Sequence, residues 1–479
     1  LYIKNLLHIL SFYVIHLFFK SFGCKINNNN SNKQVQTELF SLVEPSKKVE
    51  VGFTSTKVSS FGGLAAIMSQ KQNVEFLYEF AKRIKDWRNP DFIEHTLEEM
   101  ITQRVLQISS GYEDADDCDI LRKDRMLKLA TGRIPSDGDL CSQPTMSRLE
   151  NHVGHKELYE LGKLFVSDFM DSYEKAPRQI IIDLDDFNSD VYGTQQLCLF
   201  NNYYGEYCYM PLVAFEGYSG KLIAVMLRPG RTNKRTNVYG FVRRLIRTLR
   251  KRWKKTVIIV RGDGMFSSQE LMEWINNGSK ETRNVHFVLG MTAYKPIKDR
   301  MAVVYGHMKD LYHITHEPQK TYRRILYRAK SWNKPQWLAV KVEYNAMGGN
   351  IRCVVTDLFW KEPKRLYEHY YCKRGDCELY IKELKRGVDA DRMSCNSFSA
   401  NQFRLFLHAA AYVVLYRTRE QVFSGTDLCN ASFIRLRERI ILSPVIVTEM
   451  KTKIKIEFSD KHCYRQALER VLNPLLRTA

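Results

Sequence analysis

The stretch QIIIDLDDF, residues Gln179–Phe187, joins a run of β-branched residues to a group of acidic ones. Such an apolar run predicts a buried β-strand. Side chains alternate along a strand, so Asp183 and Asp185 are expected on the same face. Two carboxylates on one face repel each other unless a cation lies beside them. The stretch therefore predicts a strand that ends at a cation site, although each acid alone could also be a solvated turn or cap residue.

The segments that follow predict an α/β domain built of packed layers. Its first helix has apolar residues on one side and arginines on the other, which is typical of a helix packed on a sheet. The expected elements are strands within 208–217 and 221–230, a helix over Val238–Trp253, a strand over Val257–Val260 and a helix within 268–277.

Asp263 follows the expected strand Val257–Val260 in a glycine-flanked turn. Open α/β sheets bind their ligands at the carboxyl ends of strands. Mg²⁺ is usually held by one or two carboxylates together with phosphate oxygens. The sequence therefore predicts a hard-cation site that combines Asp263 with Asp185 or Asp183.

A third carboxylate comes from YYCKRGDCELYIKELK, residues Tyr370–Lys385, within an expected helix over Tyr367–Arg386. Glycine in a helix costs roughly 1 kcal/mol relative to alanine, so Gly375 weakens the helix prediction. Such a helix would carry a stripe on which Glu378 binds metal while two basic residues bind phosphates. The stripe consists of Tyr371, Arg374, Glu378, Ile381 and Lys385.

These residues lead to a resemblance. The spacing Tyr371-x2-Arg374-x3-Glu378-x6-Lys385 resembles the signature of the DDE transposases of bacterial insertion sequences. The surrounding motifs are similar to the DDE domain group 1 transposases from about Val49 to about Ile440. They are FGGLAAI, GYEDADDCDILRKD, SQPTMSRLEN, IDLDDFNSDVYGTQQ, VRGDGMF and FSANQFRLFLHAAAY.

The resemblance implies an α/β fold with an RNase H-like mixed sheet flanked by helices. It also implies a β-rich insertion between the second and third acids and a helical N-terminal DNA-binding region. The expected boundaries are a non-globular leader over 1–45, the N-terminal region over 46–175, the catalytic core over 176–284 and 359–425, the insertion over 285–358 and a basic C-terminal region over 426–479.

The resemblance also implies a site. Asp185, Asp263 and Glu378 would be catalytic and would hold two Mg²⁺ or Mn²⁺ ions. Phe187 stands where the family usually has threonine, which leaves Asp183 as an alternative first acid. Tyr371, Arg374 and Lys385 would contact DNA. In the insertion, Trp332 or Trp337 would stack on an unpaired end base or belong to the core.

The implied activity is transposition by phosphoryl transfer. The enzyme would cleave the ends of its insertion sequence and join the 3′-OH ends to target DNA, acting as a homodimer on double-stranded DNA. Two alternatives stay open: a metal-dependent nuclease that does not join strands, and a domesticated or inactive relative that only binds DNA.

The charge of the chain agrees with a polyanionic partner. The 73 Lys and Arg residues exceed the 53 Asp and Glu residues by 20, as is common for nucleic-acid-binding proteins. Arg243 and Arg247 lie on the basic helix, and Lys451, Lys453 and Lys455 lie on one face of an expected strand. Both groups could contact phosphates without reading sequence, or could simply be solvated.

In the N-terminal region, Ser142 is expected to cap a helix that exposes Arg148. This pattern is typical of a helix-turn-helix reader, and equally of an ordinary capped helix. Within the insertion, five short runs are expected to be β-rich, including MAVVYGH, residues Met301–His307.

Eleven cysteines without a regular framework predict reduced thiols in a cytoplasmic protein. The resemblance places that protein at the bacterial nucleoid. Cys372 and Cys377, taken with His369 and Cys353, fit no usual zinc spacing, so we expect both to be incidental and replaceable. The apolar stretch Leu6–Phe19 is shorter than the ~20 residues of a membrane span, and no membrane partner is expected.

Overall fold

An eight-stranded mixed sheet organises the part of the chain that the computed structural model describes, residues 57–191, 193–231 and 236–473. The expected leader and its apolar stretch lie outside these residues. The strand order is β10-β11-β12-β9-β8-β2-β6-β7. The strands are β2 (Gln179–Asp186), β6 (Leu212–Glu216), β7 (Leu222–Met226), β8 (Val257–Gly262), β9 (Val285–Met291), β10 (Gln319–Tyr327), β11 (Gln336–Asn345) and β12 (Gly348–Thr356).

The strand that contains Asp183 and Asp185 lies inside this sheet, which confirms the prediction from its apolar run. β2 pairs in parallel with β8 and antiparallel with β6. β8 in turn pairs in parallel with β9, while β6 and β7 form an antiparallel hairpin. The carboxyl ends of β2 and β8 therefore lie side by side at one edge of the sheet.

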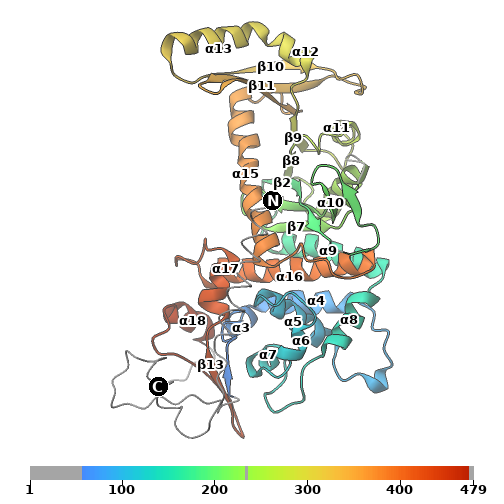
Figure 1. The fold of residues 1–479 in the computed structure, drawn as a ribbon, viewed down its shortest axis with the longest axis vertical. Helices are drawn as coiled ribbons and strands as arrows, with labels where there is room; N and C mark the ends of the chain where they lie inside the picture. Colours follow the sequence, from blue (N-terminus) through green and yellow to red (C-terminus); the bar gives the residue numbers. More distant parts are fainter. Residues whose placement is uncertain (1–56, 192, 232–235, 474–479) are drawn as a thin grey trace, which may run out of the picture. The chain divides into compact units, whose positions relative to one another are not determined.

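Helices cover both faces of the sheet (Figure 1). The alternate residues Ile180, Ile182 and Leu184 of β2 pack with α9 (His155–Asp171), α10 (Thr236–Arg252) and α11 (Gln269–Asn276). Ile181 points to the opposite face, where Leu366 and Tyr367 contact it. Asp183 and Asp185 lie two and four residues after Ile181, so their side chains point to the same face as Ile181. Both acids therefore face the helix that carries Glu378.

That helix is one irregular run from Pro363 to Gly387. It contains α14 (Pro363–Arg365), a π-helical segment (Leu366–Tyr371), a 3-10 turn (Cys372–Arg374), α15 (Gly375–Lys382) and a second π-helical segment (Glu383–Gly387). The expected helix is thus confirmed, but its regular stripe is interrupted. π-Helical turns inside helices occur often at functional sites.

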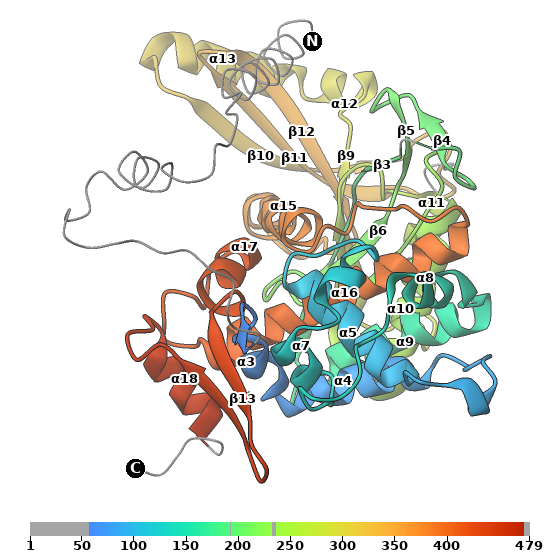
Figure 2. The same ribbon diagram turned by 60° about the horizontal axis from the view of Figure 1, so that its bottom comes forward.

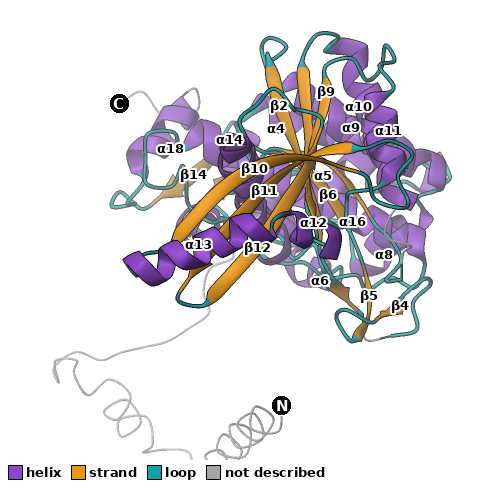
Figure 3. Cartoon of the chain, turned by 90° about the horizontal axis from the view of Figure 1, so that it is seen from above, coloured by secondary structure: helices purple, strands orange, loops and turns teal. Residues whose placement is uncertain are grey.

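The segment between β9 and this helix extends the same sheet by three antiparallel strands, β10 to β12. Figure 3 shows α13 (Ala302–Thr315) lying across these strands, after α12 (Lys295–Arg300). The expectation of a β-rich run at Met301–His307 is therefore wrong. Val304, Tyr305 and Leu311 of α13 follow helical spacing and pack against the sheet, so packing overrides the β-propensity of the two valines.

The N-terminal helices gather beside α16 (Phe398–Val422), as Figure 2 shows for α4, α5 and α8. They are α3 (Leu64–Met68), α4 (Lys71–Lys82), α5 (Leu97–Ser109), α6 (Asp117–Leu121), α7 (Arg125–Ala130) and α8 (Gln143–His152), with a short 3-10 turn at Pro90–Phe92. Twelve residues, 131–142, separate α7 from α8, whereas a helix-turn-helix joins its helices by three or four.

The C-terminal segment joins the N-terminal one through a small sheet. β13 (Val445–Glu449) pairs with β1 (Val58–Ser59) and with β14 (Ile454–Phe458), near α17 (Phe433–Leu436) and α18 (Arg465–Leu472). Lys451 and Lys453 lie in the turn between β13 and β14, and only Lys455 lies on a strand. The predicted strand face of three lysines is therefore wrong.

Candidate functional site

Asp183 is a structural acid. Its carboxylate is fully buried and makes two hydrogen bonds with the guanidinium of Arg261, one of them 2.5 Å long between Arg261 Nη2 and Asp183 Oδ2. The two residues lie opposite each other in the parallel pairing of β2 and β8. The guanidinium of Arg261 also donates hydrogen bonds to the carbonyl oxygens of Tyr370 at 2.7 Å and Lys373 at 3.2 Å. This ion pair therefore fastens the third-acid helix to the sheet.

Asp185 and Asp263 come together at the carboxyl edge of the sheet. The register pairs Leu184 with Gly262, so the two acids follow at the same level of neighbouring strands. Both line a pocket of about 470 Å³. The pKa of Asp185 is raised to about 7, chiefly by burial; Arg374 lowers it, while the negative charges of Asp263 and Asp186 add to the rise. A raised pKa of this kind marks a carboxylate that a cation would stabilise.

A small antiparallel sheet supplies the wall of the pocket. It consists of β3 (Ser189–Asp190), β5 (Glu206–Tyr209) and β4 (Leu199–Asn201). Phe200, Tyr203 and Tyr204 line the pocket from its turn, and Tyr203 is 85% exposed. A Cβ at Gly230 would meet the carbonyl oxygens of Leu199 and Cys208, so the chain after β7 packs directly on this hairpin.

Two residues of the pocket were missed at the sequence level. Asp186 forms an ion pair with the buried Arg228, whose Nε donates a hydrogen bond to the carbonyl of Met210 at 2.9 Å. Asp186, the last acid of β2, is thus engaged in an ion pair. The only sequence signal was the RPG turn at residues 228–230, which carries no spacing relation to the acids.

Glu378 stands apart from the other two acids in this structure. Its side chain is 71% exposed, and its carboxylate lies 3.8 Å from Nη2 of Arg374. Nη1 of the same guanidinium donates a hydrogen bond of 2.8 Å to Asp185 Oδ2. Arg374 therefore lies between the first and third acids.

The donor set fits a divalent cation only in part. Asp185 and Asp263 offer hard oxygen ligands in one pocket, as Mg²⁺ requires. Among the described residues, however, no three His, Cys, Asp or Glu side chains are grouped so as to hold a metal ion. Glu378 would complete such a group only if the guanidinium of Arg374 moved.

The other stripe residues lie near the acids. Tyr371 is half-buried, and its hydroxyl would be 2.5 Å from a Cβ at Gly290, so glycine is needed there. Lys385 donates to the carbonyl and side-chain oxygens of Asn188 at 3.1 and 3.2 Å and lies over the ring of Phe187. Lys385 thus ties the helix to the chain just after β2.

The two cysteines beside the stripe differ in their surroundings. Cys372 is exposed, whereas Cys377 is fully buried, and burial raises its pKa strongly. Of the two, only Cys372 can be replaced without touching the packing of the core.

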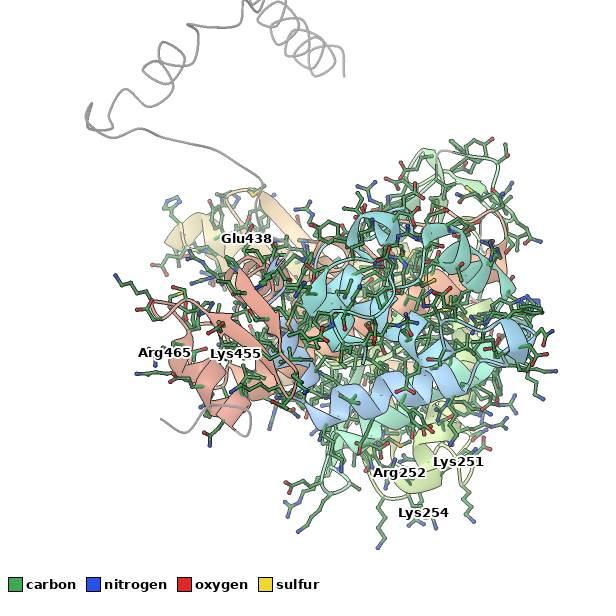
Figure 4. All side chains as sticks on the ribbon, turned by 90° about the horizontal axis from the view of Figure 1, so that it is seen from below. Lys251, Arg252, Lys254, Glu438, Lys455 and Arg465 are labelled. Atoms are coloured by element: carbon green, nitrogen blue, oxygen red, sulfur yellow. The ribbon has the colours of Figure 1, made fainter. Side chains whose placement is uncertain are left out.

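The remaining basic candidates lie outside the pocket. Arg148 is exposed on α8, and Arg247 pairs with Glu281 at 2.9 Å. Arg243 is partly buried, with its guanidinium 5.9 Å from the centre of the Tyr239 ring. At and just after the end of α10, Lys251, Arg252 and Lys254 gather at one end of the molecule (Figure 4), where Arg252 pairs with Asp171 at 2.6 Å.

Two aromatic candidates of the insertion are packed. Trp332 is 7% exposed and contacts Tyr327, and Trp337 lies against Phe359. Their placement favours a role in the core. No helix in the described ranges has both the length and the apolar content that crossing a membrane requires.

Comparisons with known proteins identify the family of the chain. The family model described as transposase DDE domain group 1 matches residues 42–479. The chain is similar in structure to a piggyBac transposase solved by cryo-EM in a synaptic complex with hairpin DNA. The two share 12% sequence identity over 86% of this chain and 85% of the other, with a TM-score of 0.42. No curated protein matches the chain in sequence.

Proposed function

This chain belongs to the transposase DDE domain group 1 family, and from that premise we propose that it binds the ends of its insertion sequence, cleaves them and joins the 3′-OH ends to target DNA. One observation carries the proposal. Asp185 and Asp263 line one pocket at the ends of two parallel strands, and the helix of Glu378 packs on the same face.

The strand order supports an RNase H-like core. β2 lies between the antiparallel hairpin of β6 and β7 on one side and the parallel strands β8 and β9 on the other. In this assignment the insertion begins after β9 and adds β10 to β12 to the edge of the core sheet. The start of the insertion thus moves from the expected 285 to after Met291, and the other boundaries expected from the sequence remain part of the proposal.

The chemistry is in-line displacement at phosphorus, first by water and then by the 3′-OH that the first step releases. In cleavage the water oxygen forms a bond to phosphorus while the bond to the 3′-oxygen breaks. In joining, the 3′-oxygen attacks a target phosphodiester and a target 3′-oxygen leaves. Two divalent ions, when bound, would activate the attacking oxygen and stabilise the leaving one.

The residues of the chain would position the DNA. Asp185, Asp263 and Glu378 would hold the ions, while Arg374 and Lys385 would bind the phosphates next to the reacting one. The wall of Phe200, Tyr203 and Tyr204 would contact nucleotide bases, because aromatic faces stack on bases of any sequence. The cations at the end of α10 and Arg148 would bind backbone phosphates of a DNA duplex held by two protomers.

Cleavage and joining assays test this proposal. The substrates are duplexes with the inverted repeats that flank the gene, either intact or already cut at the 3′ end. We expect Asp263→Asn and Glu378→Ala to lower both reactions by about 10³-fold, since they remove metal ligands worth several kcal/mol. Asp310→Asn, an exposed acid on α13, is the matched control.

The results also separate the alternatives. Cleavage of intact ends without insertion of pre-cut ends would identify a nuclease that does not join strands. DNA binding without either reaction would identify a relative that only binds DNA. Wild-type cleavage by Asp263→Asn would show that the site is wrong.

A further inference from the structure

Arg374 occupies the place that a shared cation would take between the first and third acids. One nitrogen, Nη1, lies 2.8 Å from Asp185 Oδ2, and Nη2 lies 3.8 Å from Glu378 Oε1. The side chain of Arg374 is 20% exposed, so this contact is largely shielded from solvent. A guanidinium in this position lowers the repulsion between the carboxylates.

The negative site in turn keeps Arg374 charged. Burial alone would lower its pKa, but the charges of Asp185 and Asp263 raise it above its usual value. A guanidinium cannot give up its proton to leave the site, so it must move as a cation. The guanidinium can leave Asp185 without becoming an unpaired buried charge only if another anion pairs with it.

The backbone around Arg374 is held in place by residues other than Arg374 itself. Arg261 binds the carbonyl oxygens of Tyr370 and Lys373, and Asp183 holds Arg261 in place. Within the described residues, the side chain of Arg374 makes its polar contacts with Asp185 and Glu378. A rotation of this side chain alone would therefore free both carboxylates.

We propose that Arg374 is an internal cation of the acidic centre, which excludes divalent metal until a DNA phosphate draws the guanidinium away. Metal and DNA then bind together: the phosphate replaces Asp185 as the partner of Arg374, and Asp185 becomes free for the metal. This inference rests on the proposed function, because it takes Asp185, Asp263 and Glu378 as the metal site. It adds that the protein without DNA binds metal weakly because Arg374 occupies the acidic centre.

The test uses Mn²⁺ alone as the probe and the full chain as the protein. The signal of free Mn²⁺ in electron paramagnetic resonance gives its affinity with and without a short DNA duplex, and no catalysis is needed. The wild type should bind Mn²⁺ more tightly when the duplex is present. Without DNA, Arg374→Ala and Arg374→Gln should bind Mn²⁺ at least about fivefold more tightly than the wild type, because a competing ion pair has been removed.

Two controls accompany these variants. Arg374→Lys keeps a cation and should bind Mn²⁺ as weakly as the wild type. Arg386→Ala removes an exposed arginine from the same helical run and should change nothing. Equal Mn²⁺ affinity for the wild type and Arg374→Ala, or no effect of the duplex on the wild type, would overturn the inference.

Asp263→Asn in the same assay distinguishes a wrong metal site from a wrong role of Arg374. If it leaves Mn²⁺ binding unchanged, the metal site itself is wrong and the proposed function fails with it. If it abolishes Mn²⁺ binding while Arg374→Ala behaves like the wild type, the metal site stands and only the role of Arg374 is wrong.

Discussion

The choice between Asp183 and Asp185 as first acid rests on what each carboxylate contacts. Asp183 is buried against Arg261, and removing one partner of a buried ion pair costs about 3–5 kcal/mol. We therefore expect Asp183→Asn to lower the free energy of unfolding by about that amount. Asp185→Asn removes a carboxylate whose burial opposes its charge and whose partner Arg374 is partly exposed, so it should cost less stability than Asp183→Asn while abolishing cleavage.

Urea denaturation and cleavage by each folded variant measure the two effects separately. Asp183→Asn protein that remains folded should keep part of its cleavage activity. The assignment of Asp185 fails if Asp185→Asn cleaves DNA while Asp183→Asn is stable and inactive.

At the scale of elements, the hairpin of β4 and β5 presents aromatic rings to the pocket without burying them. Tyr203 is 85% exposed, and such exposure of a large ring marks a binding surface. Stacking on a base is worth about 1–3 kcal/mol, so Tyr203→Ala should weaken binding of single-stranded DNA by about 5- to 150-fold. Fluorescence anisotropy measures this, with Tyr203→Phe as the conservative variant and Tyr78→Ala, an exposed tyrosine on α4, as the control. Equal losses for Tyr203→Ala and Tyr78→Ala would contradict it.

The sequence predicted those elements whose signals are local. The strand β2 and the positions of Asp185 and Asp263 at the ends of β2 and β8 follow from an apolar run and a turn. The helix that carries Glu378 follows from its spacing, while the role of Glu378 as third acid stays a prediction, since its side chain stands apart from the other two acids. The helix α13 was missed because its apolar spacing continues to Leu311, beyond the short valine-rich run. The contact of Arg374 with Asp185 joins residues 189 positions apart, and the ion pair of Asp186 with Arg228 joins residues 42 apart. No local pattern predicts such pairs.

At the scale of the whole molecule, a buried polar network joins the N-terminal helices to α16. Glu150 of α8 accepts hydrogen bonds from Arg104 of α5 at 2.7 Å and from Arg404 of α16 at 3.1 Å. Burial would raise the pKa of Glu150, but the two arginines lower it to about 2. One turn further along α16, His408 lies fully buried and binds the carbonyl of Val388. Burial and the two arginines lower its pKa to about 3.

The network gives the fold a defined sensitivity to acid. Glu150 stabilises the fold above its unfolded pKa of about 4.3, and that contribution is lost only as the pH falls through about 2. His408 titrates at a higher pH: between about pH 6.5 and 3 it is protonated in the unfolded chain but neutral in the folded one, so stability falls as the pH falls.

His408→Gln cannot titrate, and its amide can still donate to the Val388 carbonyl. Between pH 7.5 and 5 the wild type should therefore lose about 2 kcal/mol more stability than His408→Gln, since each bound proton is worth about 1.4 kcal/mol per pH unit. Urea denaturation of both proteins at the two pH values measures this difference, because the contributions of the other titrating groups cancel. Equal losses of stability in the two proteins would show that the acid sensitivity does not come from His408.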